Sequence, residues 1–144
     1  MHPFPHRYVV ASTATPEGDI AINSPGLPPL VTITPPEFDG PGGKWSPETL
    51  LVAAVADCYL LTFRGIAKAS RMPWSGLSVE CAGTLERPDR TTQFTRFDLR
   101  ARLTLPSHVS EEQARRILTR AEETCLITRS LTGQTTLHAQ IERT

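Results

Sequence analysis

The feature that most constrains the fold is a long apolar segment, residues 46–63, in which Asp57 is the only charged residue after Leu50. Ser46 suits a helix N-cap, Pro47 suits the first helical position, and Glu48 places an acid where the helix dipole favours one. A helix that is apolar around most of its circumference is buried inside a protein. We therefore expect a long buried central helix that continues to residue 70 and ends before the proline at position 73.

The residues before this segment predict strands. Residues 7–14, 19–23 and 30–34 are rich in β-branched side chains and are separated by turn sequences with Pro and Gly. The loop that follows, residues 35–45, contains too many prolines and glycines for a helix or a central strand. Its two aromatic residues, Phe38 and Trp45, either line a pocket or pin the loop to the core, and we favour pinning.

The residues after the apolar segment predict a hairpin, a helix and a final strand. Residues 77–85 and 94–105 alternate polar and apolar side chains around a turn-rich connector, and residues 135–142 form the last strand. Ser110 is expected to cap a helix, with Gln113 at the capping-box position. The order βββ-α-ββ-α-β indicates an α+β fold with antiparallel sheets. A length of 144 residues fits one domain, residues 1–144.

Charge and hydropathy exclude several classes of function. The chain carries 15 basic and 15 acidic residues, so bulk electrostatics does not favour nucleic acid or an anionic membrane. Residues 1–7 lack the apolar core of a signal peptide, and the longest apolar run is interrupted and short for a bilayer. We expect a soluble, cytoplasmic protein without a membrane or nucleic-acid partner.

The cysteines are the residues best suited to chemistry. Cys58 lies in the apolar segment, Cys81 in an alternating strand, and Cys125 after the second predicted helix. In a cytosolic protein such thiols serve in redox chemistry, bind metal or fill the core. No CxxC or HExxH spacing indicates zinc, and no phosphate-binding loop is present, so we expect no metal and no cofactor. Cys81 is expected to be packing, whereas the function depends on whether Cys58 and Cys125 meet.

Two stretches of the sequence resemble a known family. The pattern Ser46-Pro47-Glu48-x-Leu50-x₃-Ala54-x₃-Cys58, followed by the segment 125–131 (Cys-Leu-Ile-Thr-x-Ser-Leu), is similar to the OsmC/Ohr family of thiol-dependent peroxidases. The expected order of elements fits the same family, so the resemblance covers nearly the whole chain. It implies an intertwined homodimer with two active sites at the interface.

The resemblance also implies a reaction. Cys58 corresponds to the peroxidatic thiol, which forms a sulfenic acid, and Cys125 to the resolving thiol, which forms a disulfide with it. The implied substrates are organic hydroperoxides, and the implied reductant is a dithiol of the lipoyl type. Glu48 matches the glutamate of the family's active site. Because ten residues of helix rise about 15 Å, we expect Glu48 to act across the dimer interface if it acts on a thiol.

The chain departs from the family in one respect. The peroxidases carry an arginine in the N-terminal strands, paired with the glutamate, and residues 14–19 contain none. Arg129 and Arg7 are the candidate cations that would replace it as thiolate-stabilising groups. This departure keeps an alternative open, in which a divergent OsmC-like protein with weak or no peroxidase activity binds a small apolar ligand or senses oxidants.

Overall fold

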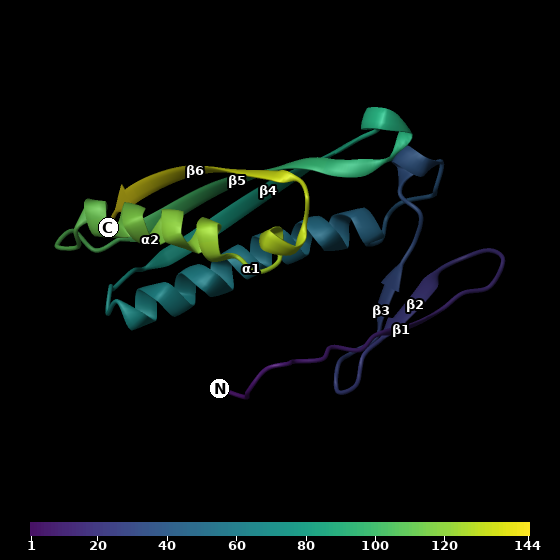
Figure 1. The fold of residues 1–144 in the computed structure, drawn as a ribbon, viewed down its shortest axis with the longest axis horizontal. Helices are drawn as coiled ribbons and strands as arrows, with labels where there is room; N and C mark the ends of the chain where they lie inside the picture. Colours follow the sequence, from purple (N-terminus) through teal and green to yellow (C-terminus); the bar gives the residue numbers. More distant parts are fainter. The chain divides into compact units, whose positions relative to one another are not determined.

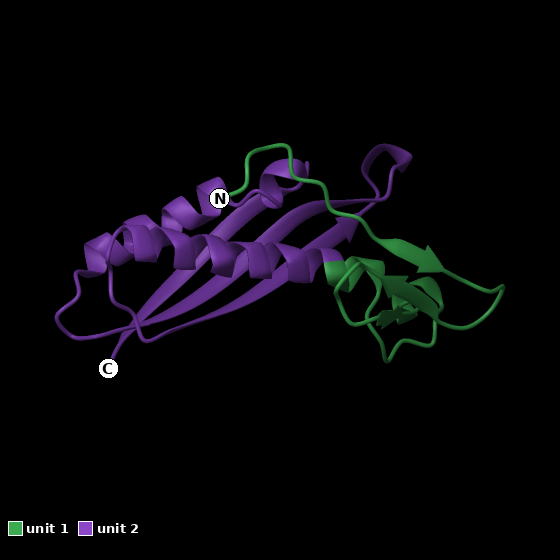
Figure 2. Ribbon diagram, turned by 90° about the horizontal axis from the view of Figure 1, so that it is seen from below, with its two compact units in different colours: residues 1–50 green, residues 51–144 purple.

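The computed structural model describes residues 1–144 and divides them into two compact units, residues 1–50 and residues 51–144 (Figure 2). The order of elements is βββ-α-ββ-α-β, as the sequence predicts, and the fold is of the α+β class (Figure 1). The long helix α1 begins in the first unit and continues in the second. We describe each unit by itself.

The first unit is a small antiparallel sheet followed by a loop. Its strands are β1 (Ala11–Thr13), β2 (Ile20–Asn23) and β3 (Leu30–Thr32), which pair in that order. The three expected strands are therefore present, although β1 and β3 are shorter than the β-branched runs suggested. Gly and Pro residues close the turns between them, as turn chemistry requires.

The loop after β3 folds back on its own start. The Ile33 amide donates to the Trp45 carbonyl at 2.9 Å, and a short 3₁₀ turn spans Pro36–Phe38. Gly40 lies so close to Thr34 that a Cβ atom at position 40 would be 2.0 Å from the Thr34 carbonyl oxygen. Only glycine fits there, so this residue holds the loop in place.

Helix α1 spans Pro47–Ala69 and begins with a reciprocal cap. The Thr49 amide donates to the Ser46 hydroxyl oxygen at 3.2 Å, and the Ser46 amide donates to the Thr49 hydroxyl oxygen at 2.9 Å. This is a capping box with Thr in the place of the usual Glu or Gln, and it satisfies two backbone donors at once. Ser46 is fully buried, which makes the cap a part of the core rather than a surface feature.

The second unit is a three-stranded sheet with two helices. The strands are β4 (Gly76–Glu86), β5 (Gln93–Leu105) and β6 (Gln134–Arg143), and β5 lies between the other two. Helix α2 spans Glu111–Thr124, and its first amides are capped by Ser110, whose hydroxyl accepts from the Gln113 amide at 3.3 Å. The predicted hairpin and the predicted cap of the second helix are confirmed.

The pairing of β6 corrects the expected sheet. Strands β4 and β5 are antiparallel, but β5 and β6 run parallel from Arg96↔Gln134 to Leu105↔Arg143. The expectation of purely antiparallel sheets is therefore wrong at β6. The reason is topological: α2 returns the chain to the starting end of β5, which makes β5-α2-β6 a crossover unit, and such units join parallel strands.

The core lies between one face of this sheet and the two helices (Figure 2). The alternation predicted for β5 is confirmed, since Phe97, Leu99, Ala101, Leu103 and Leu105 are all buried. The buried residues of α2 are Ala114, Ile117, Leu118 and Ala121. The opposite face of β5 carries arginines, and Arg96, Arg100 and Arg102 pair with Asp98, Glu80 and Glu142.

Helix α1 is less buried than its composition suggests. Only Val55, Tyr59, Phe63 and Ala67 are buried, at a spacing of four residues, while Leu61 remains 53% exposed. A single chain has only one sheet face against which α1 can pack, so the other apolar faces of α1 stay partly exposed to solvent. The expectation that the longest apolar run is too short for a bilayer is wrong for α1, which by length and composition alone could cross a membrane. A core helix of a soluble protein meets the same criterion.

The buried cap of α1 gives a testable expectation. Replacing the side chain of a capping serine by alanine leaves a helix amide without its acceptor, at a cost of about 1–2 kcal/mol. We expect Ser46→Ala to lower the free energy of unfolding by that amount in urea denaturation. Ser70→Ala, at the exposed end of the same helix, is the matched control and should change it by less than about 0.5 kcal/mol. Equal effects of the two substitutions would contradict the role of Ser46.

Candidate functional site

The two thiols singled out in the sequence lie next to each other. Cys58 is half-buried in the middle of α1, and Cys125 is fully buried at the C-cap of α2. Burial is the largest cause that raises the pKa of the Cys125 thiol, and a hydrogen bond and like-charge repulsion from Cys58 raise this pKa further. The Thr128 amide and hydroxyl act in the opposite direction. Both cysteines are in the free thiol form.

The surrounding contacts explain why the thiols meet. Tyr59 follows Cys58 on α1, and its hydroxyl donates to the Leu118 carbonyl of α2 at 3.3 Å. This contact joins the two helices near the thiols, and burial raises the pKa of the Tyr59 hydroxyl so that it stays a donor. At the C-terminal end of α2 the Cys125 amide donates to the Glu122 carbonyl at 3.3 Å, which ends the helix at this residue.

A third thiol belongs to the same neighbourhood. Burial raises the pKa of Cys81 to about 11, and the charges of Asp98 and then Cys125 contribute to this rise. The strand alternation already indicated that Cys81 shares the inner face of β4 with Leu77 and Val79, and all three pack against the core. What the sequence did not indicate is that this inner position lies within electrostatic range of Cys125. Nowhere in the chain do three or more His, Cys, Asp or Glu side chains form a group suited to a metal ion.

Glu48 lies in the first unit, in the first turn of α1. Its Oε2 atom is buried and has no hydrogen-bond partner, and the residue takes part in no ion pair. Glu48 lines a hollow of about 340 Å³ together with Phe38 and residues of β2 and β3. Phe38 is thus among the residues that line this hollow. Trp45 is not among the lining residues; its backbone is bridged to β3 and its side chain is half exposed.

The two candidate cations are both exposed and neither forms an ion pair. Arg129 lies in the short 3₁₀ turn Thr128–Ser130, and its amide donates to the Cys125 carbonyl at 3.2 Å. This places the Arg129 backbone next to the Cys125 backbone, and the Arg129 guanidinium group pairs with no carboxylate. Arg7 precedes β1 in the first unit. The proposed role of each in stabilising a thiolate stays a prediction.

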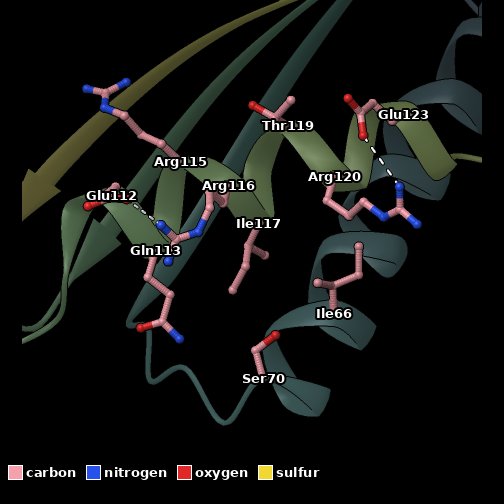
Figure 3. Close-up of a pocket in the computed structure, with 10 residues that line it drawn as sticks. All are labelled: Ile66, Ser70, Glu112, Gln113, Arg115, Arg116, Ile117, Thr119, Arg120 and Glu123. Atoms are coloured by element: carbon pink, nitrogen blue, oxygen red, sulfur yellow. Dashed lines mark hydrogen bonds and ion pairs between the residues drawn. The ribbon is translucent and has the colours of Figure 1, made fainter.

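A groove between α1 and α2 in the second unit contains no cysteine (Figure 3). It measures about 720 Å³, with Ile66 and Ile117 at its apolar part. Figure 3 shows that its arginines already have acidic partners, since Arg116 pairs with Glu112 and Arg120 with Glu123. These i,i+4 and i,i+3 pairs are ordinary features of an exposed helix face. The groove is therefore separate from the thiol site in its residues and in its chemistry.

The raised pKa of Cys81 predicts slow alkylation. At pH 8 a thiol with a pKa of about 11 is ionised to about 0.1%, against about a quarter for an ordinary thiol, and only the thiolate reacts. We expect iodoacetamide to modify Cys81 in the folded protein about a hundredfold more slowly than in urea, measured by peptide mass spectrometry. The rate should then rise about tenfold per pH unit up to pH 10. A rate that levels off near pH 9 would contradict this prediction.

Comparison with solved structures shows the same fold in other proteins. An OsmC-like protein of unknown function from Vibrio cholerae superposes with a TM-score of 0.85 and 18% identity, covering 94% of this chain and 100% of its own. An organic hydroperoxide resistance protein OsmC from Legionella pneumophila superposes with a TM-score of 0.75 and 19% identity, covering 97% of this chain and 99% of its own. The α+β fold of the OsmC-like proteins is thus confirmed.

Comparison of sequences agrees with the structural result. The uncharacterised protein YmaD of Bacillus subtilis is 26% identical over 139 residues, which are 94% of this chain and 92% of YmaD. The model of the OsmC-like protein family matches residues 40–139, a range that contains α1, the whole of β4, β5 and α2, and all three cysteines. The chain therefore belongs to the OsmC-like protein family.

Proposed function

We propose that this protein is a thiol-dependent peroxidase that reduces organic hydroperoxides through Cys58 and Cys125. The observation that carries the proposal is the adjacency of the two thiols, because a resolving thiol must reach the sulfur that the peroxide oxidises. At the level of the family, the relation to an organic hydroperoxide resistance protein supports a role of this kind.

The proposed reaction has three steps. The Cys58 thiolate attacks one peroxide oxygen, the O–O bond breaks, and the leaving alkoxide takes a proton to become an alcohol, which leaves Cys58 as a sulfenic acid. The Cys125 sulfur then attacks the Cys58 sulfur, and a disulfide forms as water leaves. A dithiol of the lipoyl type reopens this disulfide by two successive exchanges and is itself oxidised to a disulfide.

The burial of the two thiols matches these roles. Cys58 is only half-buried, which gives a peroxide access to its sulfur, whereas Cys125 is fully buried and sheltered from the peroxide. Burial, together with the neighbouring Cys58, raises the pKa of Cys125 and keeps this thiol protonated in the resting protein. We propose Arg129 as the cation that stabilises the Cys58 thiolate; its support is the hydrogen bond from its amide to the Cys125 carbonyl, which ties the two residues together.

We further propose that the protein acts as a cytoplasmic homodimer in which α1 lies at the interface. The support is the open apolar surface of α1, of which Leu61 is the most exposed leucine. Exposed apolar surface on this scale is typical of an interface. In such a dimer Glu48, about 15 Å of helix rise from Cys58 on its own chain, would serve the site of the second copy.

The alternative function is ligand binding or oxidant sensing with little turnover. The observation that favours it is the absence of arginine from residues 14–19, together with the lack of any cation paired with Glu48. In this alternative Cys58 is oxidised slowly and the disulfide, once formed, persists as a signal. The two functions differ in turnover and can be separated by kinetics.

Peroxide turnover tests the main proposal. With tert-butyl hydroperoxide and dihydrolipoamide, the protein should consume peroxide catalytically, Cys58→Ser should fall to the background rate, and Cys125→Ser should stop after one equivalent. Cys81→Ser is the matched control because Cys81 lies near Cys125 without a role in the cycle, and it should keep at least half of the activity. Turnover that persists in Cys58→Ser would refute the proposal, and stoichiometric oxidation without turnover would favour the alternative.

The oligomeric state tests the proposed interface. A buried glutamate in place of an interface leucine costs several kcal/mol, so Leu61→Glu should convert the dimer to a monomer at micromolar concentration in sedimentation velocity. Leu27→Glu is the control, since Leu27 is more exposed than Leu61 (65% against 53%) and lies in the turn between β2 and β3. A wild-type chain that sediments as a monomer would contradict the proposal.

A further inference from the structure

The Cys58 thiol has a hydroxyl group beside it on its own helix. Cys58 and Thr62 are four residues apart on α1, a spacing that places their side chains on the same helix face, one turn apart. The Cys58 sulfur and the Thr62 hydroxyl oxygen lie 3.9 Å apart, within hydrogen-bonding reach of the large sulfur atom. Both side chains are half-buried, so the contact is partly shielded from water.

The Thr62 hydroxyl does not bond to the backbone of its own helix. A threonine inside a helix can donate to the carbonyl three or four residues before it, and Thr124 does so in α2, where its hydroxyl donates to the Arg120 carbonyl at 2.7 Å. For Thr62 the one hydrogen-bond partner is the Cys58 sulfur. The Thr62 proton is therefore available to this sulfur.

The second thiol also has a threonine beside it, but the geometry there is different. The Thr128 hydroxyl donates to the Cys125 carbonyl at 3.0 Å, so its proton is engaged by the backbone. Thr128 acts to lower the pKa of Cys125, but burial is the larger effect and this pKa stays raised. Cys58 is thus the thiol with a hydroxyl donor that no carbonyl occupies, as suits the thiol that must ionise to attack a peroxide.

The charged and titratable groups around Cys58 leave room for a hydroxyl donor. Asp57, next to it on α1, is an exposed acid, and Cys125 at the end of α2 is a protonated thiol that hydrogen-bonds to Cys58. Cys81 on β4 lies within electrostatic range of Cys125, and its pKa of about 11 keeps it protonated too. Arg129, the proposed cation, contacts Cys125 through its backbone amide.

We propose, on the basis of the peroxidase function proposed above, that Thr62 is a catalytic residue whose hydroxyl donates a hydrogen bond to the Cys58 thiolate. The contact shortens when Cys58 ionises, because hydrogen bonds to an ionised acceptor are shorter and about twice as strong as neutral ones. As the sulfur attacks the peroxide, the S–O bond forms, the O–O bond breaks, and the leaving alkoxide takes a proton from solvent. Thr62 keeps its own proton throughout.

The pH profile of Cys58 alkylation in the full-length protein tests this role. Thr62→Val removes the hydroxyl and keeps the β-branched shape, so modification of Cys58 by iodoacetamide at pH 7 should slow about tenfold, with the whole profile moved up by about one pH unit. Peptide mass spectrometry measures this rate. Thr62→Ser keeps the hydroxyl and should restore the wild-type rate to within about twofold. Thr119→Val, on the exposed face of α2, is the matched control and should leave the profile unchanged.

Peroxide turnover gives a second readout. Thr62→Val should lower kcat/KM for tert-butyl hydroperoxide about tenfold at pH 7, and by less at pH 9, because more of the thiolate then forms without the hydroxyl. A substitution that only disturbs packing would lower the rate equally at every pH, and this outcome or an unshifted alkylation profile overturns the proposal. Thr62→Ala, with the better helix former, gives the same test if circular dichroism shows that Thr62→Val is not folded.

The role of Thr62 and the peroxidase function fail in distinguishable ways. A wild-type protein that consumes no peroxide would contradict the proposed function, and the alkylation profile, which needs no peroxide, would still decide whether Thr62 stabilises the thiolate. A wild-type protein that turns over peroxide, with Thr62→Val unchanged in both measurements, would overturn the role of Thr62 alone.

Discussion

The thiol site depends on the packing of one stripe of α1 against the sheet and α2. Val55, Tyr59, Phe63 and Ala67 are buried at intervals of four residues and join the same apolar core as the inner face of β5. Each large side chain buried in this way stabilises the fold by about 1.5–3 kcal/mol. The stripe sets the rotation of α1, and this rotation turns Cys58 toward the C-terminal end of α2, where Cys125 lies.

The same packing leaves α1 with more apolar surface than one chain can cover. The helix is apolar on nearly all sides, but a single sheet face buries only one of them. A surface helix of a monomer would carry charges at these open positions. This uncovered apolar surface of α1 is the physical basis for proposing that two copies pack around the helix. The same apolar composition explains why α1 also meets the criterion for a membrane span.

The electrostatics of the two units differ in a way that bears on function. In the second unit, burial raises the pKa of Cys81 and of Cys125, and the thiols repel one another as anions. In the first unit, Glu48 keeps a buried oxygen without any donor. Residues 14–19 contain no arginine, and no cation of the chain pairs with Glu48.

The sequence by itself determined the features that depend on neighbours along the chain. The caps at Ser46 and Ser110 and the buried alternation of β5 follow from side chains a few residues apart, and the structure confirms all three. Three other features required the tertiary structure: the parallel pairing of β6, the position of Cys81 near Cys125, and the unpartnered carboxylate of Glu48. Each of them depends on contacts between distant segments, which local propensity and periodicity do not encode.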